Sequence, residues 1–310
     1  MAENFIYDLI IIGGGPSGLT AAIYAARRAV KTLVLAKEFG GQAVYASKVE
    51  NFPGIDMISG YELMEKIKAQ AEHLGAEVKS VETNEIKKEN DFFSVRDKDG
   101  NSYEGKSLIL SFGAVPRKLG LPNEDKFKGN GISYCATCDA PFYKNKNVAV
   151  VGGGNAALDA ALLLAKFAKQ VYLIHRRDEF KGEEVRVNDV KKLPNVEIIL
   201  NSEVKEIKGE KNITGIAVGK VSSGDLRDLE VNGIFVEIGH IVESEFVSKM
   251  VALDERKQIM VNDKNETNVP GVFAAGDATA VPYKQIIIAA GEGAKAALSA
   301  YSYLQTIKSK

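Results

Sequence analysis

The chain has 310 residues, of which 45% are hydrophobic and 26% are charged. This length favours two domains, with one large α/β unit as the alternative, and the composition is that of a globular protein rather than a disordered one. With 40 basic and 41 acidic residues, the chain has no bulk charge to attract nucleic acid or an anionic lipid surface. We therefore expect neither nucleic acid nor a membrane as a partner.

The first predicted element is a βαβ unit with a glycine turn over residues 8–36. An apolar strand leads into Gly13, Gly15 and Gly18, and a helix of small residues and a second apolar strand follow. In such a turn the first glycine allows the tight bend, the second lets backbone N–H groups approach a pyrophosphate, and the third lets helix and strand pack closely. The spacing predicts a dinucleotide site. Glu38, just past the second strand, is the candidate acid for the ribose, although it comes slightly late.

Residues 92–111 alternate in a way that predicts antiparallel strands, and both cysteines of the chain follow, at Cys135 and Cys138. A structural zinc site needs about four ligands, and none of the three histidines has finger-like spacing from the pair. Zinc shared across a dimer and a nucleophilic cysteine remain alternatives. A purely structural disulfide is disfavoured, because it would close too short a loop to stabilise the fold much. A redox-active dithiol is favoured, and so few cysteines favour a cytoplasmic protein. Asp139 could shuttle a proton to the thiols or cap a helix.

A second βαβ unit is predicted over residues 147–175, with Gly152, Gly154 and Ala157 in the three turn positions. The two units together suggest two dinucleotides, one flavin and one nicotinamide. After the second strand of this unit come His175, Arg176, Arg177 and Lys181. Arginines here accommodate a 2′-phosphate, which favours NADP, although a solvated basic helix start is the alternative.

Short runs between about 196 and 240 alternate apolar and polar residues, so they predict antiparallel strands. Near the C-terminus a short apolar strand leads to Gly276 and Asp277, and a helix is expected from about Lys284. Asp277 could hydrogen-bond a cofactor hydroxyl or serve as an ordinary turn residue. Glu292 and Lys295 interrupt the apolar residues of this helix too early for a membrane span, so it is predicted to be buried.

Seven motifs of this chain occur in the order typical of the low-molecular-weight thioredoxin reductases, and the chain resembles that family from about residue 6 to about residue 304. They are GGGPSG (13–18), GGQ (40–42), ENFPG (50–54), CATCD (135–139), GGGNAA (152–157), HRRDEF (175–180) and GVFAAGD (271–277). The resemblance implies an α/β fold with two Rossmann-like βαβ domains, each with a small β meander, the second inserted into the first. The FAD domain would comprise 1–115 and 246–310, and the NADPH domain with the cysteine pair would comprise 116–245.

The resemblance also implies a homodimer that passes electrons from NADPH through FAD and the cysteine pair to thioredoxin or a thioredoxin-like protein. Cys138 would face the flavin, Cys135 would attack the thioredoxin disulfide, Asp139 would be the acid/base, and one domain would rotate against the other. No metal is expected. The residues expected to hold FAD are Gly13, Gly15, Pro16, Ser17, Glu38, Gly41, Gln42, Asn51, Gly276, Asp277, Lys284 and Gln285. Those expected to hold NADPH are Gly152, Gly154, Asn155, Ala157, His175, Arg176, Arg177 and Lys181.

Several positions depart from the pattern of the family. Lys181 stands where arginine is usual, so the charge is kept but the planar fork is lost. Ala140 and Pro141 follow the cysteine motif where glycine is common, and Ile286 stands where a small residue is common. These departures leave NADH or ferredoxin as an alternative electron donor, and another thioredoxin-like protein as an alternative acceptor.

Overall fold

The computed structural model describes residues 6–46 and 48–308. The chain divides into two compact units. Unit 1 comprises the described residues up to Val115 and from Ile241 onward, and unit 2 comprises Pro116–His240.

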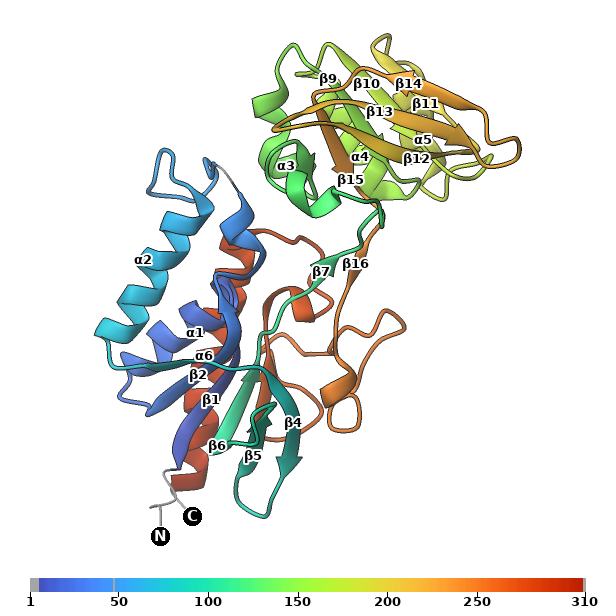
Figure 1. Ribbon diagram of the computed structural model, residues 1–310. Helices are drawn as coiled ribbons and strands as arrows, with labels where there is room; N and C mark the ends of the chain where they lie inside the picture. Colours follow the sequence, from blue (N-terminus) through green and yellow to red (C-terminus); the bar gives the residue numbers. More distant parts are fainter. Residues whose placement is uncertain (1–5, 47, 309–310) are drawn as a thin grey trace. The chain divides into compact units, whose positions relative to one another are not determined.

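Unit 1 is built on one sheet whose strands lie in the order β3-β2-β1-β6-β5-β4, with β17 also paired to β6 (Figure 1). Strands β1, β2, β3 and β17 run parallel to their neighbours, whereas β4, β5 and the start of β6 form an antiparallel meander. The elements are β1 (Tyr7–Gly14), α1 (Pro16–Ala26), β2 (Thr32–Phe39), α2 (Gly60–His73), β3 (Glu77–Ser80), β4 (Thr83–Lys88), β5 (Phe93–Asp97), β6 (Ser102–Leu110), β17 (Val272–Ala274) and α6 (Ile286–Lys308).

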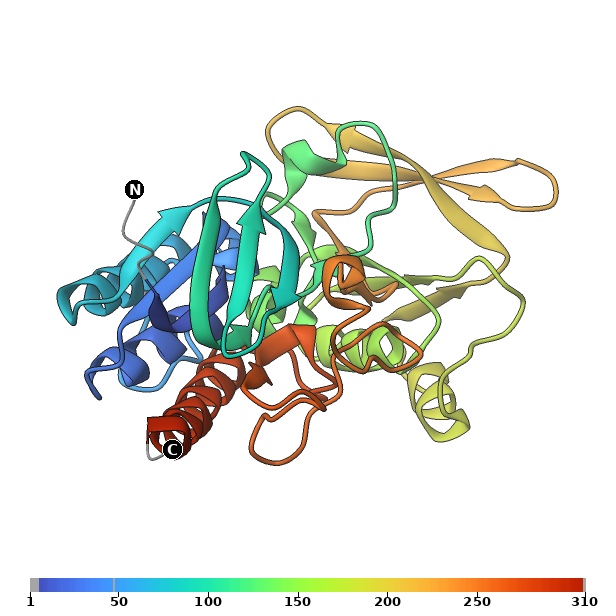
Figure 2. The ribbon, with the colours of Figure 1, turned by 90° about the horizontal axis from the view of Figure 1, so that it is seen from below.

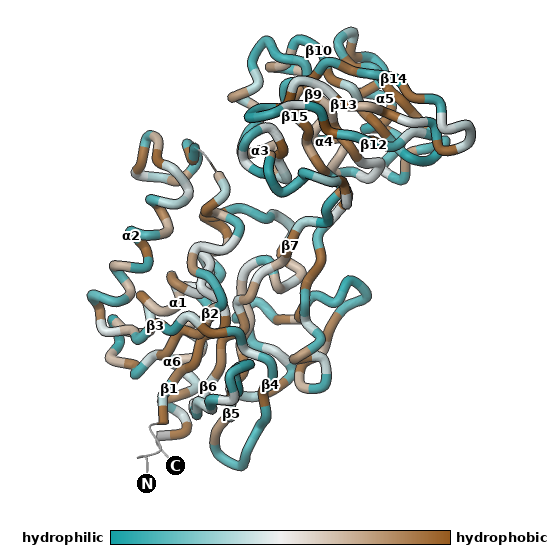
Figure 3. The backbone as a smooth tube through the Cα atoms, viewed as in Figure 1, coloured by the Kyte–Doolittle hydropathy of each residue, from teal (hydrophilic) through white to brown (hydrophobic). Residues whose placement is uncertain are grey.

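Both faces of the unit 1 sheet are covered, which explains the unbroken apolar run of β1. Leu9 and Ile11 point to the face that carries α1 and α6. Ile10 and Ile12 point to the opposite face, where they pack with the meander and with residues from about 242 to 259. Figure 2 shows α6 and the meander on opposite sides of the parallel strands, and Figure 3 shows the hydrophobic residues gathered along β1 and β6.

Unit 2 repeats this design with a parallel sheet in the order β11-β10-β9-β15-β8 and a separate antiparallel meander in the order β12-β13-β14. One face of the parallel sheet packs against α3, α4 and α5, and the other against the meander. The elements are β8 (Ile132–Ser133), α3 (Ala136–Asp139), β9 (Asn147–Val151), α4 (Asn155–Leu164), β10 (Gln170–Ile174), α5 (Glu184–Lys191), β11 (Val196–Ile199), β12 (Ser202–Gly209), β13 (Ile213–Lys220), β14 (Leu226–Leu229) and β15 (Gly233–Val236).

The expected fold class is confirmed, but the prediction that residues 196–240 are antiparallel strands throughout is wrong. Only β12, β13 and β14 pair in that way. Val196–Ile199 pairs parallel with β10, and Gly233–Val236 pairs parallel with β9 and β8. All four residues of β15 are buried, because the sheet has layers on both faces, and such a strand shows no alternation that would reveal its direction.

The chain enters and leaves unit 2 through two short strands, β7 (Val115–Pro116) and β16 (His240–Ile241), which pair with each other. Within unit 2 the N–H of Arg117 donates to the carbonyl of Gly239 at 2.9 Å, so the first and last residues of the insertion are neighbours. Residues 241–245, placed above in the inserted domain, pack in unit 1, because Val242 is buried in its core. None of the described helices is both long and apolar enough to cross a membrane.

Candidate functional site

The glycine turn of unit 1 brings backbone groups from two segments close together. Gly13 has φ 118°, and a Cβ there would lie 2.2 Å from the carbonyl oxygen of Ser111, so only glycine fits. Gly15 is the N-cap of α1, and Pro16 is the first residue of the helix. A Cβ on Gly41, which has φ 57°, would lie 3.4 Å from the Cα of Gly15. The N-terminus of α1 has backbone N–H groups that lack helical partners. It therefore lies next to a second backbone segment without a side chain at Gly41, and Gln42 follows this segment. A pyrophosphate site at a helix N-terminus requires such open backbone.

Ser17 lies in the first turn of α1 and has a buried hydroxyl without a partner. Its side chain is 4% exposed, and its Oγ makes no hydrogen bond to any residue that the structure describes. A Cβ on Gly276, which has φ 71°, would lie 2.9 Å from the Cβ of Ser17, so the turn before α6 packs directly on this helix start. A buried donor without a partner is costly, so a ligand oxygen at this position would stabilise the turn. This observation fits a bound dinucleotide phosphate.

Asp277 and Lys284 are partly buried in the segment that leads into α6. Burial raises the pKa of Asp277, and the charge of Lys284 offsets part of the increase. Burial also lowers the pKa of Lys284, whose Nζ donates to the carbonyl oxygens of Asp277 at 3.2 Å and Thr279 at 3.0 Å. Lys284 thus holds the loop that presents Asp277.

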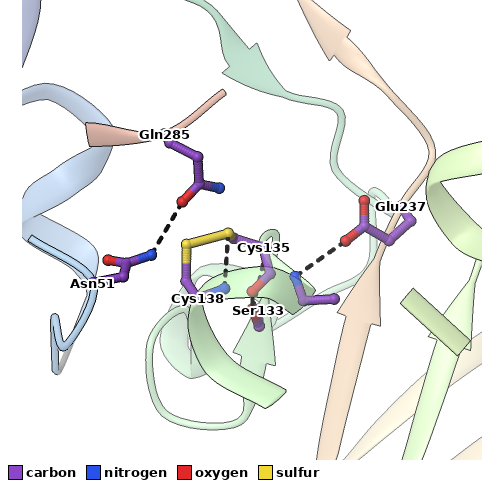
Figure 4. Close-up of a disulfide and its surroundings, with 7 residues drawn as sticks. Asn51, Ser133, Cys135, Cys138, Glu237 and Gln285 are labelled. Carbon is purple, nitrogen blue, oxygen red and sulfur yellow. Dashed lines mark hydrogen bonds between the residues drawn. A yellow bond between two sulfur atoms is a disulfide. The ribbon is translucent and has the colours of Figure 1, made fainter. Parts of the chain in front are cut away.

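Three more predicted FAD residues lie in unit 1 around these segments. The Nδ2 of Asn51 donates to the Oε1 of Gln285 at 3.1 Å, which joins a loop after β2 to the residue before α6 (Figure 4). Glu38 is exposed near the carboxyl end of β2. The structure thus links Asn51 with Gln285, whereas Glu38 remains an exposed side chain at the strand end.

In the glycine turn of unit 2, one glycine is tightly packed and another has free space beside it. A Cβ on Gly152 would lie 2.3 Å from the carbonyl oxygen of Glu237 and 2.7 Å from the Cβ of Ala157, which is fully buried. A Cβ on Gly154, the N-cap of α4, would meet nothing within 4 Å. The Oδ1 of Asn155, the first helical residue, accepts from the N–H of Glu183 at 2.7 Å. Gly154 therefore leaves space beside the helix N-terminus, where a phosphate could approach.

His175 lies against the same turn. Its side chain is 9% exposed, its ring stacks on Phe180 with 5.6 Å between centroids, and its buried Nε2 has no partner among the described residues. A Cβ on Gly153 would lie 2.2 Å from this ring. Burial lowers the pKa of His175, and the charges of Arg177, Arg176 and Lys181 lower it further, whereas a hydrogen bond to the backbone of Glu179 raises it.

The basic side chains after β10 are exposed and available to a ligand. Arg176, Arg177 and Lys181 form no ion pair with any acid in the described part of the chain. The backbone N–H of Lys181 donates to the carbonyl of Gly153 at 2.7 Å, so the basic segment is tied to the glycine turn. These residues precede α5 rather than begin a helix.

Cys135 and Cys138 form a disulfide with 5.3 Å between their Cα atoms. Cys135 is the N-cap of α3, and its Sγ accepts from the N–H of Cys138 at 3.2 Å. Its own N–H donates to the Oγ of Ser133 at 3.1 Å (Figure 4). No group of three or more possible metal-ligating side chains occurs among residues 6–46 and 48–308. The pair is thus a short-range disulfide with a hydrogen-bond donor next to one sulfur.

Asp139 is the last residue of α3, and its N–H donates to the carbonyl of Cys135 at 3.1 Å. Burial raises the pKa of its carboxyl, and a hydrogen bond with Ser133 offsets part of the increase. A carboxyl with a raised pKa keeps its proton to a higher pH than an ordinary aspartate does, which favours an acid/base role. Asp139 is the N-cap residue of the 3-10 helix Ala140–Tyr143, but its side chain makes no capping hydrogen bond there, so it remains a candidate acid/base.

Sequence reasoning missed Glu237. Its Oε1 accepts from the N–H of Ala136, between the two cysteines, at 3.3 Å, and burial raises the pKa of its carboxyl to about 7. The signal available in the sequence is an ionisable residue that directly follows the four apolar or small residues of β15. The carboxyl ends of parallel strands are where such sheets place functional groups.

The two glycine turns, the basic segment and the disulfide are features that fit a protein that binds nucleotides and exchanges disulfides. The family described as "Pyridine nucleotide-disulphide oxidoreductase" matches residues 7–294, and the chain belongs to this family. It is therefore an oxidoreductase, and membership implies a flavin and a nicotinamide cofactor.

The resemblance to low-molecular-weight thioredoxin reductases is confirmed by two of the comparisons. A thioredoxin reductase of Streptomyces coelicolor is 39% identical over 306 residues, which are 97% of this chain and 95% of that protein. The crystal structure of a thioredoxin reductase from Streptococcus pyogenes matches with a TM-score of 0.92 and 35% identity, over 98% of this chain and 100% of that one.

A third relative has a different name. It is a subunit of alkyl hydroperoxide reductase in Xanthomonas campestris pv. phaseoli, and it is 39% identical over 308 residues, or 98% of this chain. The chain spans only 58% of the length of that relative. The comparisons therefore agree on a disulfide oxidoreductase and differ in the partner that their names indicate.

Proposed function

We propose that this protein is a thioredoxin reductase of the cytoplasm. In this proposal, electrons pass from NADPH through FAD and the Cys135–Cys138 pair to the disulfide of thioredoxin or a thioredoxin-like protein, and the enzyme works as a homodimer. The observation that carries the proposal is the disulfide at α3, in the same unit as a glycine turn whose basic residues form no ion pair within the described chain.

Unit 1 is the proposed FAD-binding unit. The N-terminus of α1, with Gly15 and the free hydroxyl of Ser17, would hold the pyrophosphate, and Gly41 would leave room for it. Asp277, fixed by Lys284, would accept a hydrogen bond from a cofactor hydroxyl, and Glu38 would hold the ribose. Bound FAD supplies a two-electron acceptor that takes a hydride from a nicotinamide and passes the electron pair to a disulfide.

Unit 2 is the proposed NADPH-binding unit. Gly154 leaves space for the pyrophosphate at the start of α4, next to the side chain of Asn155. Arg176, Arg177 and Lys181 would bind the 2′-phosphate, because guanidinium and ammonium groups make charge-assisted hydrogen bonds to phosphate oxygens. The buried Nε2 of His175 has no partner in the described chain, and a nucleotide oxygen could supply one.

The proposed roles of the dithiol residues follow the expected order of events. Cys138 would receive the electrons, and Cys135 would attack the disulfide of the protein substrate as a thiolate. The N–H of Cys138, which already points at the Sγ of Cys135, would stabilise that thiolate. Asp139, with its raised pKa, would hold the proton that the departing thiol needs.

A second candidate function is a flavin-dependent disulfide reductase with another donor or acceptor. Lys181 offers a point charge where an arginine would offer a planar fork, which weakens the case for NADPH against NADH or ferredoxin. The relative that belongs to an alkyl hydroperoxide reductase favours an acceptor other than a free thioredoxin.

The decisive experiment is anaerobic reduction of the bound flavin by NADPH, NADH and reduced ferredoxin, followed by its absorbance. Bleaching by NADPH at a rate far above that by NADH supports the proposal, and the reverse order would overturn the donor. Turnover of thioredoxin by Cys138→Ser, compared with Cys135→Ser, tests the dithiol. Both variants should bind FAD normally and lose turnover, and turnover retained by Cys138→Ser would exclude the relay.

A further inference from the structure

Glu237 directly follows β15 and lies beside the glycine turn of unit 2. Its N–H donates to the carbonyl of Val151, the last residue of β9, at 2.8 Å. Its carbonyl oxygen is the atom that a Cβ on Gly152 would approach to 2.3 Å. The backbone of Glu237 is therefore fixed by the sheet at the edge where the candidate nucleotide residues gather.

The side chain of Glu237 turns toward the dithiol helix. Its Oε1 accepts from the N–H of Ala136 at 3.3 Å, and Ala136 is the residue directly after Cys135 (Figure 4). The carboxyl is partly buried, and it takes part in no salt bridge within the described chain. The proposed function assigns no role to this carboxyl. In the described structure, it is the only side-chain group that accepts a hydrogen bond from the N–H of Ala136.

The charge of this carboxyl changes near neutral pH. Burial raises its pKa to about 7, and the hydrogen bond from Ala136 offsets part of that increase. The elements around it are α3, the end of β9, β8 and its own segment. Their titratable groups are Asp139 on α3, Tyr134 after β8 and His240 on its own segment, whereas the end of β9 and its glycine turn carry none. Cys135 and Cys138 become titratable only when their disulfide is reduced.

We propose that Glu237 is a positioning residue that couples proton uptake to reduction of the Cys135–Cys138 pair, through its hydrogen bond to the first residue of α3. The inference rests on the proposed redox role of the pair. An ionised Glu237 opposes a thiolate on the neighbouring helix, and a neutral Glu237 does not. By linkage, formation of the thiolate favours the protonated carboxyl.

Electrons and protons balance in the coupled step when a dithiol such as dithiothreitol is the reductant. The Cys135–Cys138 bond breaks, a sulfur–sulfur bond closes in the reagent, and two electrons and two protons move to the protein. When one of the new thiols ionises, its proton leaves, and Glu237 takes one up from solvent. The combined charge of Glu237 and the two sulfur atoms therefore remains at one negative unit instead of two.

The test is the equilibrium between the full-length protein and dithiothreitol redox buffers, with the reduced fraction read by alkylation and mass spectrometry. Glu237→Gln keeps an oxygen that can accept from Ala136 but removes the titration. Glu230→Gln is the matched control, because Glu230 is an exposed residue of the same unit. Neither a nicotinamide nor thioredoxin is present, so the result does not depend on the donor or acceptor of the proposed function.

At pH 8 we expect Glu237→Gln to raise the ratio of reduced to oxidised protein by about threefold to tenfold, since one pKa unit corresponds to a factor of ten. At pH 6, where Glu237 is already neutral, the ratio should stay within about twofold of the wild type. Equal ratios at both pH values would overturn the coupling. A change of the same size at both pH values would reveal a purely structural role and would overturn it as well.

A second measurement keeps the inference testable if Glu237→Gln does not fold. In Asp139→Asn protein, the infrared band of a protonated carboxyl should grow when the disulfide is reduced at pH 7, because Glu237 is then the carboxyl beside α3. No growth of this band would contradict the proposal.

Discussion

The position of His175 against the second glycine turn leads to a sharp prediction for Gly153→Ala. The new Cβ would lie 2.2, 2.3 and 2.4 Å from three atoms of the His175 ring. His175 is 9% exposed and its ring stacks on Phe180, so the ring has little room to move away from the new methyl group. Gly154→Ala is the matched control, because its Cβ would meet nothing within 4 Å and neither glycine has a left-handed φ.

Forcing a methyl group into a packed site costs about 1–3 kcal/mol, and we expect Gly153→Ala to lower the free energy of unfolding by that amount. In Gly154→Ala, alanine is a weaker N-cap than glycine and so destabilises the protein, whereas the smaller entropy of the unfolded chain stabilises it. The free energy of unfolding should therefore change by less than about 0.5 kcal/mol. Urea unfolding followed by far-ultraviolet circular dichroism measures the difference. Hydrogen exchange of peptides from residues 147–175 should locate the loss in β9 and β10.

The double variant Gly153→Ala/His175→Ala separates this clash from other effects of the alanine. In the His175→Ala background, Gly153→Ala should lower the free energy of unfolding by less than about 0.5 kcal/mol. The coupling energy between positions 153 and 175 should therefore be close to the full cost of Gly153→Ala in the wild type. An equal cost of the alanine with and without His175 would contradict a clash with the ring. A Gly153→Ala protein that is no less stable than Gly154→Ala would contradict it as well.

Three further predictions concern the ligands and the pH. Ser17→Ala should weaken FAD binding by about fivefold to tenfold, the value of one hydrogen bond, without lowering the stability of the FAD-free protein, and a titration of flavin fluorescence would show it. Replacing Arg176 and Arg177 with alanine should lower kcat/KM for NADPH by at least about tenfold and leave that for NADH within about twofold, which steady-state kinetics would check. Because burial lowers the pKa of His175 below 6.5, the unfolded chain binds more protons at acid pH. Stability should therefore decrease as the pH falls through 6.5, and His175→Gln should flatten this decrease in urea titrations.

The features that depend on local backbone geometry could be predicted from the sequence. The glycine turn before α1 needs left-handed φ at Gly13 and close packing at Gly18, where a Cβ would lie 1.9 Å from the carbonyl of Gly13. Such requirements leave a spacing in the chain that identifies the turn without knowledge of its neighbours. The two-domain fold followed from finding this spacing twice.

The features that depend on distant partners could not be predicted. Whether Gly233–Val236 pairs parallel or antiparallel depends on which strands lie beside it, and because the strand is buried throughout, it lacks the alternation of an antiparallel strand with one exposed face. Asn51 bonds Gln285 across 234 positions of sequence. The raised pKa of Glu237 arises from burial, and its contact with Ala136 across 101 positions of sequence does not show in the residues around it.

The hydrogen bond from Arg117 to Gly239 has a consequence for how this chain could have been assembled and could be rebuilt. Because the ends of unit 2 are neighbours, the unit can be added to or removed from another fold at a single loop without separating the strands around it. Each unit also has hydrophobic clusters of its own. The disulfide, the basic segment and Glu237 all belong to unit 2. Replacing the corresponding segment of a relative with Pro116–His240 would therefore transfer all three together.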